Sequence, residues 1–352
     1  MQQEPRHKDQ RDHENNSEQN SDRTVDSNGE GATGGMIGPA ALPRQGRDDE
    51  CVVCETLDSD LSNVPKEIAK GIFDFIGISK VASLDAGNAH CIALRNDGTV
   101  AAWGRNDFGQ TTIPGGLINI KQVAAGGHHS LALRQDGTVV AWGSNFNGQA
   151  TVPDGLADVK TISAGGWHSS ALLENGRIVS WGADTYEQTR VPEGLENVRS
   201  VSAGAFHSLA LTENGQVVAW GDKMRGQIVE QQGLENITMV SAGSTFSLAL
   251  RSDGRIMAWG KNKDGQTSVP SGTGQIKAIS AGVSHSLALS ENGTVHAWGS
   301  GKFGQNDVPP DLCMVKSIAA GGCFSVAVRQ DGSAIAWGYN HYSQTDIPEE
   351  FQ

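Results

Sequence analysis

The sequence predicts an all-β fold: a seven-bladed β-propeller of four-stranded antiparallel blades. Two observations carry this prediction. A 39-residue pattern recurs seven times between residues 78 and 350 without an insertion or deletion. Within each repeat, short runs of β-forming residues are separated by glycine, proline and Asp-Gly or Asn-Gly pairs, and no helical period is present. A single four-stranded sheet cannot bury both of its faces, so seven of them are expected to pack in a ring.

Tryptophan and glycine mark the register of the repeats. The chain has 45 glycines in 352 residues, against a usual share of about 7 %. Seven of the eight tryptophans lie 39 residues apart, at positions Trp103, Trp142, Trp181, Trp220, Trp259, Trp298 and Trp337. Glycines keep the same register, which identifies them as corners between strands rather than as a flexible polymer. The repeats are assigned to residues 78–116, 117–155, 156–194, 195–233, 234–272, 273–311 and 312–350.

The second repeat shows the four predicted strands. Ile120 to Ala125 is the first run, and His129 to Arg134 is the second. The Gln135-Asp136-Gly137 turn is a hairpin signal that leads to a third run, Thr138 to Trp142. A short fourth run, Gln149 to Val152, ends at a proline. Large and small apolar residues alternate in the second run, as expected for a strand that is buried on both faces.

The chain before the repeats differs in composition. Residues 1–61 are polar, of mixed charge and almost free of aromatics, and are expected to be disordered. Residues 62–77 read as a short amphipathic helix, with Pro65 in the first turn and Ile68, Ile72, Phe73 and Ile76 on one face. We expect this helix to pack on the propeller, the alternative being a docking peptide. The propeller domain is assigned to residues 78–352.

The repeats carry the pattern A-G-x-x-H-S-L-A-L, D/N-G, V-x-A-W-G-x-N-x-x-G-Q and V-P, and lack the G-H and W-D signature of another propeller class. This pattern resembles the regulator of chromosome condensation repeat family in its short bacterial form. The A-W-G-x-N and G-Q-x-x-V-P phrases are similar to those of the propeller-type β-lactamase inhibitor proteins. The resemblance implies a seven-bladed propeller that binds other proteins.

Two loops of each repeat vary, whereas the Asp-Gly and Asn-Gly hairpins barely change. One is the turn after A-G and the other follows W-G, and the strand order places both at the same end of the ring. In the resembling inhibitor proteins, contact residues come from these two positions. Because aromatic side chains often dominate protein contacts, we predict a partner-binding surface; packing between loops is the alternative. The candidates are Phe108, Phe146, Trp167, Tyr186, Phe206, Met224, Lys263, Phe303, Tyr339 and Tyr342.

Charge and hydropathy exclude several partner classes. The formal net charge is −13, and residues 1–79 carry 8 basic and 16 acidic side chains. No basic stripe suited to phosphates is present, so we expect no nucleic-acid partner. No apolar run is long enough to span a membrane, and the first thirty residues lack a secretory core. We expect a cytoplasmic monomer, with export by a non-classical route left open.

No catalytic residue, metal site or cofactor is predicted. The recurring histidines His90, His129, His168, His207 and His285 give way to Phe246 and Phe324 in two repeats, so we interpret them as packing residues whose ring nitrogens bond loop carbonyls. The serine that follows in the strand points to the opposite face and cannot act with its neighbour as nucleophile and base. Cys51 and Cys54 form a single C-x-x-C without the second pair that a zinc ribbon needs.

The predicted function is non-enzymatic binding of a protein partner through the variable loops. The alternatives are a regulator or nucleotide exchange factor of a small GTPase and an inhibitor of an enzyme such as a β-lactamase. Exchange in the resembling family depends on a wedge-like insertion, for which seven repeats of equal length leave no room. A photoreceptor of the resembling family would need several tryptophans clustered in the variable turn before the histidine. Here only Trp167 lies in that turn, so we expect no photoreception. The sequence leaves the mode of ring closure open; exchange of a terminal strand between the first and last blades would pair residues 78–84 with 344–348.

Overall fold

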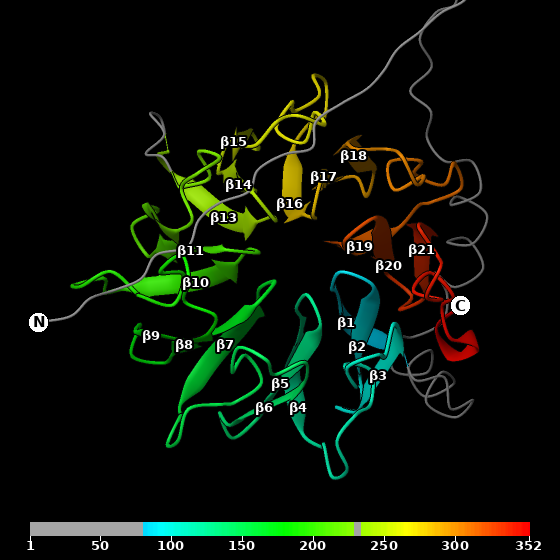
Figure 1. Ribbon diagram of the computed structural model, residues 1–352. Coiled ribbons are helices and arrows are strands. Elements are labelled where there is room, and N and C mark those ends of the chain that lie inside the picture. The colour runs from blue at the N-terminus through cyan, green and yellow to red at the C-terminus, as the bar shows by residue number, and fades with distance from the viewer. Residues whose placement is uncertain (1–79, 229–233) are drawn as a thin grey trace, which may run out of the picture. The chain divides into compact units, whose positions relative to one another are not determined.

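The computed structural model describes residues 80–228 and 234–352 (Figure 1). Within these ranges the chain is all-β apart from one short 3₁₀ turn, η1 (Glu349–Phe351). The predicted polar segment (1–61), the predicted helix (62–77) and the Cys51/Cys54 pair lie outside the described residues. In the part that the structure describes, no helix is long and apolar enough to cross a membrane.

Each repeat contributes three strands, which form one antiparallel sheet in sequence order. The first strands are β1 (Val81–Ala86), β4 (Ile120–Ala125), β7 (Val159–Ala164), β10 (Val198–Ala203), β13 (Ile237–Ala242), β16 (Ile276–Ala281) and β19 (Val315–Ala320). The middle strands are β2 (His90–Arg95), β5 (His129–Arg134), β8 (His168–Leu173), β11 (His207–Thr212), β14 (Phe246–Arg251), β17 (His285–Ser290) and β20 (Phe324–Arg329). The third strands are β3 (Val100–Gly104), β6 (Val139–Gly143), β9 (Ile178–Gly182), β12 (Val217–Gly221), β15 (Ile256–Gly260), β18 (Val295–Gly299) and β21 (Ala334–Gly338).

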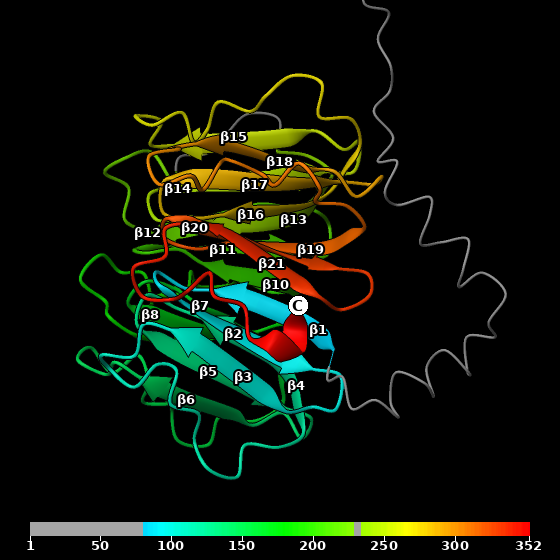
Figure 2. The same cartoon turned by 90° about the vertical axis from the view of Figure 1, so that its right-hand side faces the viewer.

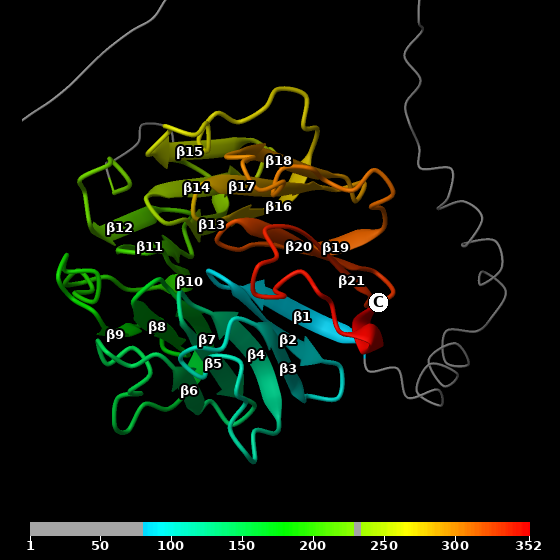
Figure 3. The same cartoon turned by 45° about the vertical axis from the view of Figure 1, so that its right-hand side comes forward.

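The seven sheets form a closed ring. The first strand of each sheet contacts the first strand of the next, and β19 of the last sheet contacts β1 of the first. Figure 1 shows these first strands around the centre, with the third strands outermost. In the two side views the sheets follow one another like blades, and loops leave both ends (Figure 2, Figure 3). The described part of the chain is therefore a seven-bladed β-propeller, as the sequence predicts.

The prediction of four strands in each blade is wrong. In the second repeat, residues 149–152 run as turn and irregular chain toward the next sheet. The Gln149 carbonyl accepts hydrogen bonds from Trp181 Nε1 at 3.0 Å and from Ser169 Oγ at 2.8 Å, both in the third sheet. Its side-chain Oε1 accepts the Asn147 N–H at 2.9 Å. This segment is fixed by bonds to side chains across the seam, and so it adds no strand to the sheet.

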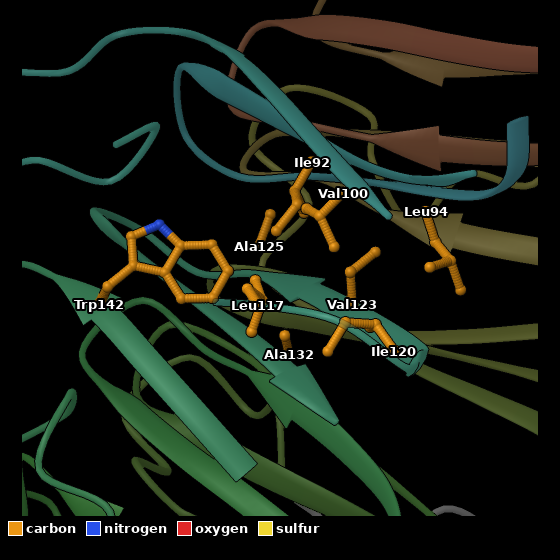
Figure 4. Packing of buried hydrophobic residues seen from close by; sticks show 9 residues of the cluster. All are labelled: Ile92, Leu94, Val100, Leu117, Ile120, Val123, Ala125, Ala132 and Trp142. Atoms are coloured by element: carbon orange, nitrogen blue, oxygen red, sulfur yellow. The ribbon is translucent and has the colours of Figure 1, made fainter. Parts of the chain in front are cut away.

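Apolar side chains fill the seam between neighbouring sheets. Figure 4 shows Ile92 and Val100 of the first sheet facing Val123 and Ala132 of the second, with Leu117 of the connecting chain between them. The middle strands are buried on both faces: Leu131, Ala132 and Leu133 have no exposed surface. Alternation of large and small side chains along these strands therefore reflects burial on both sides, as predicted.

The Ala-Gly turns bring the backbones of neighbouring blades into close approach. A Cβ atom placed on Gly126 would lie 2.3 Å from the His129 ring and 2.6 Å from the Gly165 carbonyl oxygen of the next blade. The corresponding Gly87 would meet the Gly126 carbonyl oxygen at 2.2 Å. No side chain fits here, which explains why this glycine is constant in all seven repeats.

The C-terminal residues close the seam between the seventh and first sheets. Ile347 and Phe351 pack among side chains of both sheets, in the positions that Ile113 and Leu117 occupy at the seam between the first two. Phe351 is 1 % exposed. Its ring centroid lies 6.0 Å from that of Trp103.

Ring closure through pairing of residues 78–84 with 344–348 is not observed. β1 pairs with β2, and residues 344–348 form no strand. The Val81 N–H instead donates to the Gly332 carbonyl at 3.1 Å, and Trp103 Nε1 donates to the Gln344 carbonyl at 3.2 Å. The tryptophan bond recurs at every seam, and the backbone bond also joins the first and second sheets, from Ile120 N–H to the Gly98 carbonyl at 3.3 Å, and the second and third, from Val159 N–H to the Gly137 carbonyl at 3.2 Å. The last seam therefore uses the same bonds as the first two, with the chain ends meeting there.

Buried histidines and serines join neighbouring blades. The histidine Nε2 lies 2.9–3.1 Å from a serine Oγ of the next sheet in the pairs His90–Ser130, His129–Ser169, His168–Ser208, His207–Ser247 and His285–Ser325. Each of these serine hydroxyls also lies 2.8–3.1 Å from a glutamine carbonyl. A carbonyl only accepts, so the serine donates to it and the histidine Nε2–H donates to the serine. The prediction of a direct bond from histidine to a loop carbonyl is therefore corrected: a serine stands between them.

These histidines stay neutral in the fold. Burial lowers the pKa of His90, His129 and His207 to about 3, and that of His168 and His285 to about 4. Nδ1 of each ring has no hydrogen-bond partner, so no contact there compensates for the loss of water around a charged ring. Their protonation is coupled to unfolding.

Replacing the closing aromatic should weaken the whole ring. We expect Phe351→Ala to lower the free energy of unfolding by about 3–5 kcal/mol, because it removes a fully buried ring from the last seam. Urea denaturation followed by tryptophan fluorescence measures this loss. Phe146→Ala is the matched control, since Phe146 is 80 % exposed. Equal stability of the two variants would contradict closure by the C-terminal residues.

The buried histidines should make stability fall in mild acid. Between about pH 6.5 and 4 these histidines are protonated in the unfolded chain but stay neutral in the folded one. The free energy of unfolding therefore decreases as the pH falls. Each of these histidines lowers the free energy of unfolding by about 2 kcal/mol when the pH falls from 7 to 5. We expect His207→Phe, which copies the residue at positions 246 and 324, to lose about 2 kcal/mol less than the wild type between pH 7 and 5. Urea midpoints at both pH values, with His341→Phe as an exposed control, test this; equal losses in all three proteins would refute it.

Candidate protein-binding face

Two loops of every repeat lie at the same end of its sheet. In the second repeat the Ser144 N–H, just after the third strand, donates to the His128 carbonyl in the turn before the second strand, at 2.8 Å. The equivalent bond in the seventh repeat, Tyr339 N–H to the Cys323 carbonyl, measures 2.9 Å. We call this end the loop face: residues 87–89 and 104–110 of the first repeat, and their equivalents at 39-residue intervals.

The Asp-Gly and Asn-Gly hairpins lie at the other end, which we call the hairpin face. The Gln135 N–H donates to the Asn119 carbonyl at 2.8 Å, tying the hairpin to the chain that enters the sheet. Asp136 Oδ1 accepts the Thr138 N–H at 2.9 Å and closes the turn. These local bonds explain why the hairpins change little between repeats.

Six of the ten predicted residues lie along one arc of aromatic rings on the loop face. Starting from the sixth repeat, Phe303 lies 5.0 Å from Tyr339, measured between ring centroids. At the first repeat, Phe108 lies 5.7 Å from Phe146 in a T-shaped contact. The six residues are Phe303, Tyr339, Tyr342, Phe108, Phe146 and Trp167.

Three residues that the sequence reasoning missed connect this arc. His341 lies 6.1 Å from the ring of Tyr339 and 4.9 Å from that of Tyr342. The Arg105 guanidinium lies over two rings, 4.8 Å from Tyr342 and 5.9 Å from Phe108.

His128 continues the arc to the third repeat, with its ring 5.3 Å from Phe108 and 5.7 Å from Trp167. It occupies the same position in its repeat as Trp167 does, 39 residues later, and this register was the signal that could have found it. We call Phe303, Tyr339, His341, Tyr342, Arg105, Phe108, Phe146, His128 and Trp167 the aromatic arc.

The other four predicted residues lie outside the arc. Tyr186 and Phe206 form a separate pair with ring centroids 5.3 Å apart. Met224 and Lys263 follow on the loops of the fourth and fifth repeats and contact no aromatic ring of the arc within the described residues. Met224 is 74 % exposed, so it is available to a partner although it is not part of the arc.

Side chains of the arc contact one another but remain open to solvent. Phe146 is 80 % exposed, Phe303 49 % and Phe108 37 %. Trp167 and Tyr342 are half-buried among their neighbours. Rings held by one another lose little further side-chain freedom when a partner covers them, which favours binding.

Ion pairs neutralise the cations beside the arc. Arg105 Nε lies 2.6 Å from Asp107 Oδ2. On the loop of the third repeat, Arg190 pairs with Asp184 at 3.0 Å and with Glu187 at 2.8 Å. This part of the loop face therefore presents aromatic surface with balanced charge.

A cavity of about 220 Å³ opens at the axis of the loop face. The Ala-Gly turns of all seven repeats line it, and Trp167 and Phe206 are among the side chains at its wall. Asn88 and Ser244 are its polar side chains, and no titratable group lines it. The cavity offers shape and backbone groups to a ligand but no acid or base.

The buried serines are not activated nucleophiles. Ser130 and His129, for example, have no exposed surface. The Ser130 hydroxyl hydrogen is committed to the Gln110 carbonyl at 2.8 Å, and the His90 ring donates to Ser130 rather than accepting from it. A general base must accept the proton of its nucleophile, so these pairs serve the fold.

Metal-binding clusters are absent from the described ranges: no three His, Cys, Asp or Glu side chains there could hold an ion together. Cys91, Cys313 and Cys323 are free thiols. Burial raises the pKa of the Cys91 and Cys323 thiols, which keeps them protonated and unreactive.

Solved structures with a similar fold come from several proteins. The ectodomain of the receptor kinase CR4 of Physcomitrella patens is 22 % identical, covers 74 % of this chain and 74 % of its own, and has a TM-score of 0.62. Prp20p of Saccharomyces cerevisiae, studied with its binding properties to Gsp1p and histones, is 20 % identical over 79 % of this chain and 86 % of its own, with a TM-score of 0.60. The same yeast protein bound to Kap60 is 21 % identical over 77 % and 83 %, with a TM-score of 0.57. At these identities the likeness establishes the fold alone.

No curated protein sequence matches this chain. The regulator of chromosome condensation (RCC1) repeat matches seven times, at residues 81–110, 120–149, 159–188, 198–227, 237–266, 276–305 and 315–344. Each match begins at or near the first strand of a blade and ends at the glutamine that bonds to the next blade. The matches cover more than half of the chain, which therefore belongs to the family of regulator of chromosome condensation (RCC1) repeat proteins.

Proposed function

We propose that this chain is a non-enzymatic protein-binding propeller whose loop face holds a protein partner. The observation that carries the proposal is the aromatic arc, a run of contacting rings across the loops of five repeats. Aromatic side chains and arginine are the residue types that most often dominate the energy of protein interfaces. The arc concentrates both on one end of the propeller.

The difference in sequence variation between the two faces supports this proposal. The hairpin face is built from the same turn in every repeat, whereas the loop face carries different side chains at each position. Exposed aromatic rings cost solubility, and scattered ones are common on protein surfaces. Nine contacting residues in one arc are better explained by a shared contact surface than by loop packing alone.

The related structures are consistent with a protein partner. Yeast Prp20p has been studied with its binding properties to Gsp1p and histones, and it has been solved in complex with Kap60. By analogy we propose that the present chain also works through protein contacts, as a monomer in the cytoplasm. Its free cysteines suit a reducing compartment.

Two partner classes follow from the family resemblance, a small GTPase and an enzyme that the propeller inhibits. Nucleotide exchange is the less favoured of the two, because the loops that follow W-G are equal in length in all seven repeats and none forms a wedge-like insertion in the described ranges. An enzyme held by the aromatic arc needs no such insertion.

Removing aromatic side chains from the arc should abolish capture of the partner. We expect the triple variant Phe108→Ala, Phe146→Ala and Tyr342→Ala of the full chain to bind at least tenfold more weakly, since each ring of an interface centre contributes on the order of 1–2 kcal/mol. Partners are captured from cell extract on the immobilised wild type, identified, and their affinity for each variant is then measured by calorimetry.

The matched control removes exposed apolar side chains from the hairpin face. Ile118 is 60 % exposed and Met314 39 % exposed, and the double variant Ile118→Ala and Met314→Ala should bind as the wild type does. Undiminished binding by the arc variant, with its melting temperature unchanged, would reject the loop face as the binding surface. If the partner is a small GTPase, nucleotide release is measured directly, and acceleration by the wild type would replace simple binding with exchange.

A further inference from the structure

Within the described ranges, five cations on three consecutive loops of the loop face have no ion-pair partner. These loops follow W-G in the fourth, fifth and sixth repeats and span residues 222–226, 261–265 and 300–304. Their cations are Lys223, Arg225, Lys261, Lys263 and Lys302. Among the described residues, none of these side chains forms an ion pair, and none donates a hydrogen bond. We call this region the basic sector.

The basic sector contrasts with the remainder of the loop face. Arg105 and Arg190, on the loops of the first and third repeats, are both neutralised by carboxylates. Residues 80–352 carry 19 basic and 24 acidic side chains, so the propeller as a whole is negative. Three neighbouring loops therefore carry a positive charge, although the propeller as a whole has a negative net charge.

The two carboxylates on these loops do not neutralise the sector. Asp222 is 8 % exposed and turns inward, where it accepts the Met224 N–H at 2.9 Å and Gln227 Nε2 at 2.8 Å. Asp264 forms no ion pair. Asp307 follows the third loop, at the position that Arg190 occupies in the third repeat, so five cations stand against three carboxylates and the sector carries a formal excess of two positive charges.

Bonds between blades hold the three loops next to one another. The Gln227 carbonyl, at the end of the first loop, accepts from Trp259 Nε1 at 2.8 Å, just before the second loop begins. The Gln266 carbonyl, at the end of the second, accepts from Trp298 Nε1 at 2.9 Å, just before the third. A Cβ on Gly265 would lie 3.9 Å from Gly299. The cations thus lie on three neighbouring loops, which also carry the exposed Met224 and Phe303.

We propose that the basic sector docks an acidic protein segment, one rich in aspartate and glutamate. This inference rests on the proposed function and adds the chemistry of the partner: carboxylates over the fourth to sixth repeats, next to apolar surface over the aromatic arc. Complementary charge of this kind accelerates association and selects the partner's orientation. Four of the five cations are lysines, which attract carboxylates without demanding one fixed geometry.

An acidic protein segment fits the sector better than a nucleic acid does. A duplex crossing the loop face would leave the basic sector after three loops and then meet Asp184 and Glu187, on the third repeat. Phosphate binding along a duplex needs an extended basic track. A short acidic segment ends within the sector and avoids these carboxylates.

The test uses a probe of defined chemistry and does not require the natural partner. A fluorescein-labelled peptide of twenty glutamates is titrated with the full-length chain at 50 mM NaCl, and binding is followed by fluorescence anisotropy. A peptide of twenty lysines and a 20-base-pair duplex DNA serve as comparison probes. We expect the glutamate peptide to bind most tightly and to lose at least tenfold in affinity at 300 mM NaCl, where exposed charges are screened.

Charge reversal locates the binding site. The variant Lys223→Glu, Arg225→Glu and Lys263→Glu should lose at least tenfold in affinity for the glutamate peptide. The control Lys160→Glu, Arg177→Glu and Lys277→Glu makes the same change in net charge outside the loop face, and should stay within twofold of the wild type. Circular dichroism melting curves confirm that both variants are folded.

Three results would overturn the proposal. No binding of the glutamate peptide, equal losses in the two variants, or tighter binding of the duplex DNA through the same cations would each reject an acidic protein segment as the occupant. Loss of partner capture on removing aromatic rings, together with unchanged capture on reversing these charges, would leave the proposed function standing and remove this inference alone.

Discussion

The structure depends on one hydrogen bond that is repeated at every seam of the ring. The indole Nε1–H of the periodic tryptophan donates to a glutamine backbone carbonyl of the preceding blade, at 2.8–3.2 Å in all seven repeats. The glutamine stands 32 residues before the tryptophan at six seams, and at the seventh the bond runs from Trp103 to Gln344. A shift of one residue in any repeat would move the carbonyl away from the indole. This explains why seven repeats have kept one length.

The same carbonyl organises the polar core around it. At all seven seams a serine or a cysteine also donates to it: a serine at six, for example Ser130 to Gln110 at 2.8 Å, and Cys91 Sγ to Gln344 at 3.5 Å at the closing seam. Buried polar groups are costly unless paired, so each blade fixes the position of the next. Because these bonds lie beneath the loop face, the loops above them vary without disturbing the ring.

Non-glycine residues adopt a left-handed backbone both before the first strands, where asparagine or aspartate takes this conformation in four repeats, and at two positions of the loop face. The residue before the bonding glutamine has a left-handed backbone, and glycine occupies it in five repeats. Glu187 and Ser343 adopt the same conformation, with φ of 64° and 58°, at a cost on the order of 1 kcal/mol each. Glu187 uses its side chain to pair with Arg190. A side chain at these two positions is thus kept in spite of the backbone cost, on the face that we propose binds a partner.

The periodicity of the sequence was enough to predict the number of blades and their arrangement in a ring. It did not predict the structure of segments that depend on contacts between neighbouring blades. The register of Trp142 and Gly126 was enough to predict seven sheets in a ring, since period and β-propensity are local properties. The run at Gln149 has strand-like composition, but its carbonyl bonds two side chains of the next sheet, so no ladder forms there. Phe351 could not be recognised as the closing residue, because its partners lie in the first blade.

The binding role of the candidate residues stays a prediction, but the structure shows where each of them lies. Loop positions could be found from variation between repeats, and six of the ten predicted residues do meet in the aromatic arc. Arg105 was missed because only the fold shows that it lies over rings of two repeats, and His341 because only the fold shows that it contacts Tyr339 and Tyr342. His128 could have been found from its register with Trp167. The basic sector was missed because net charge averages over a chain, whereas an unpaired lysine is a property of its surroundings.

The central claim is that the ring is a scaffold and that the loop face is where a partner binds. Hydrogen–deuterium exchange of the full chain, free and in complex with its captured partner, tests this claim most directly. We expect slower amide exchange in loops 105–109, 144–148 and 339–343 on complex formation, and unchanged exchange in the hairpins at 135–137 and 330–332. Protection confined to the hairpins, with the loops unchanged, would contradict the account.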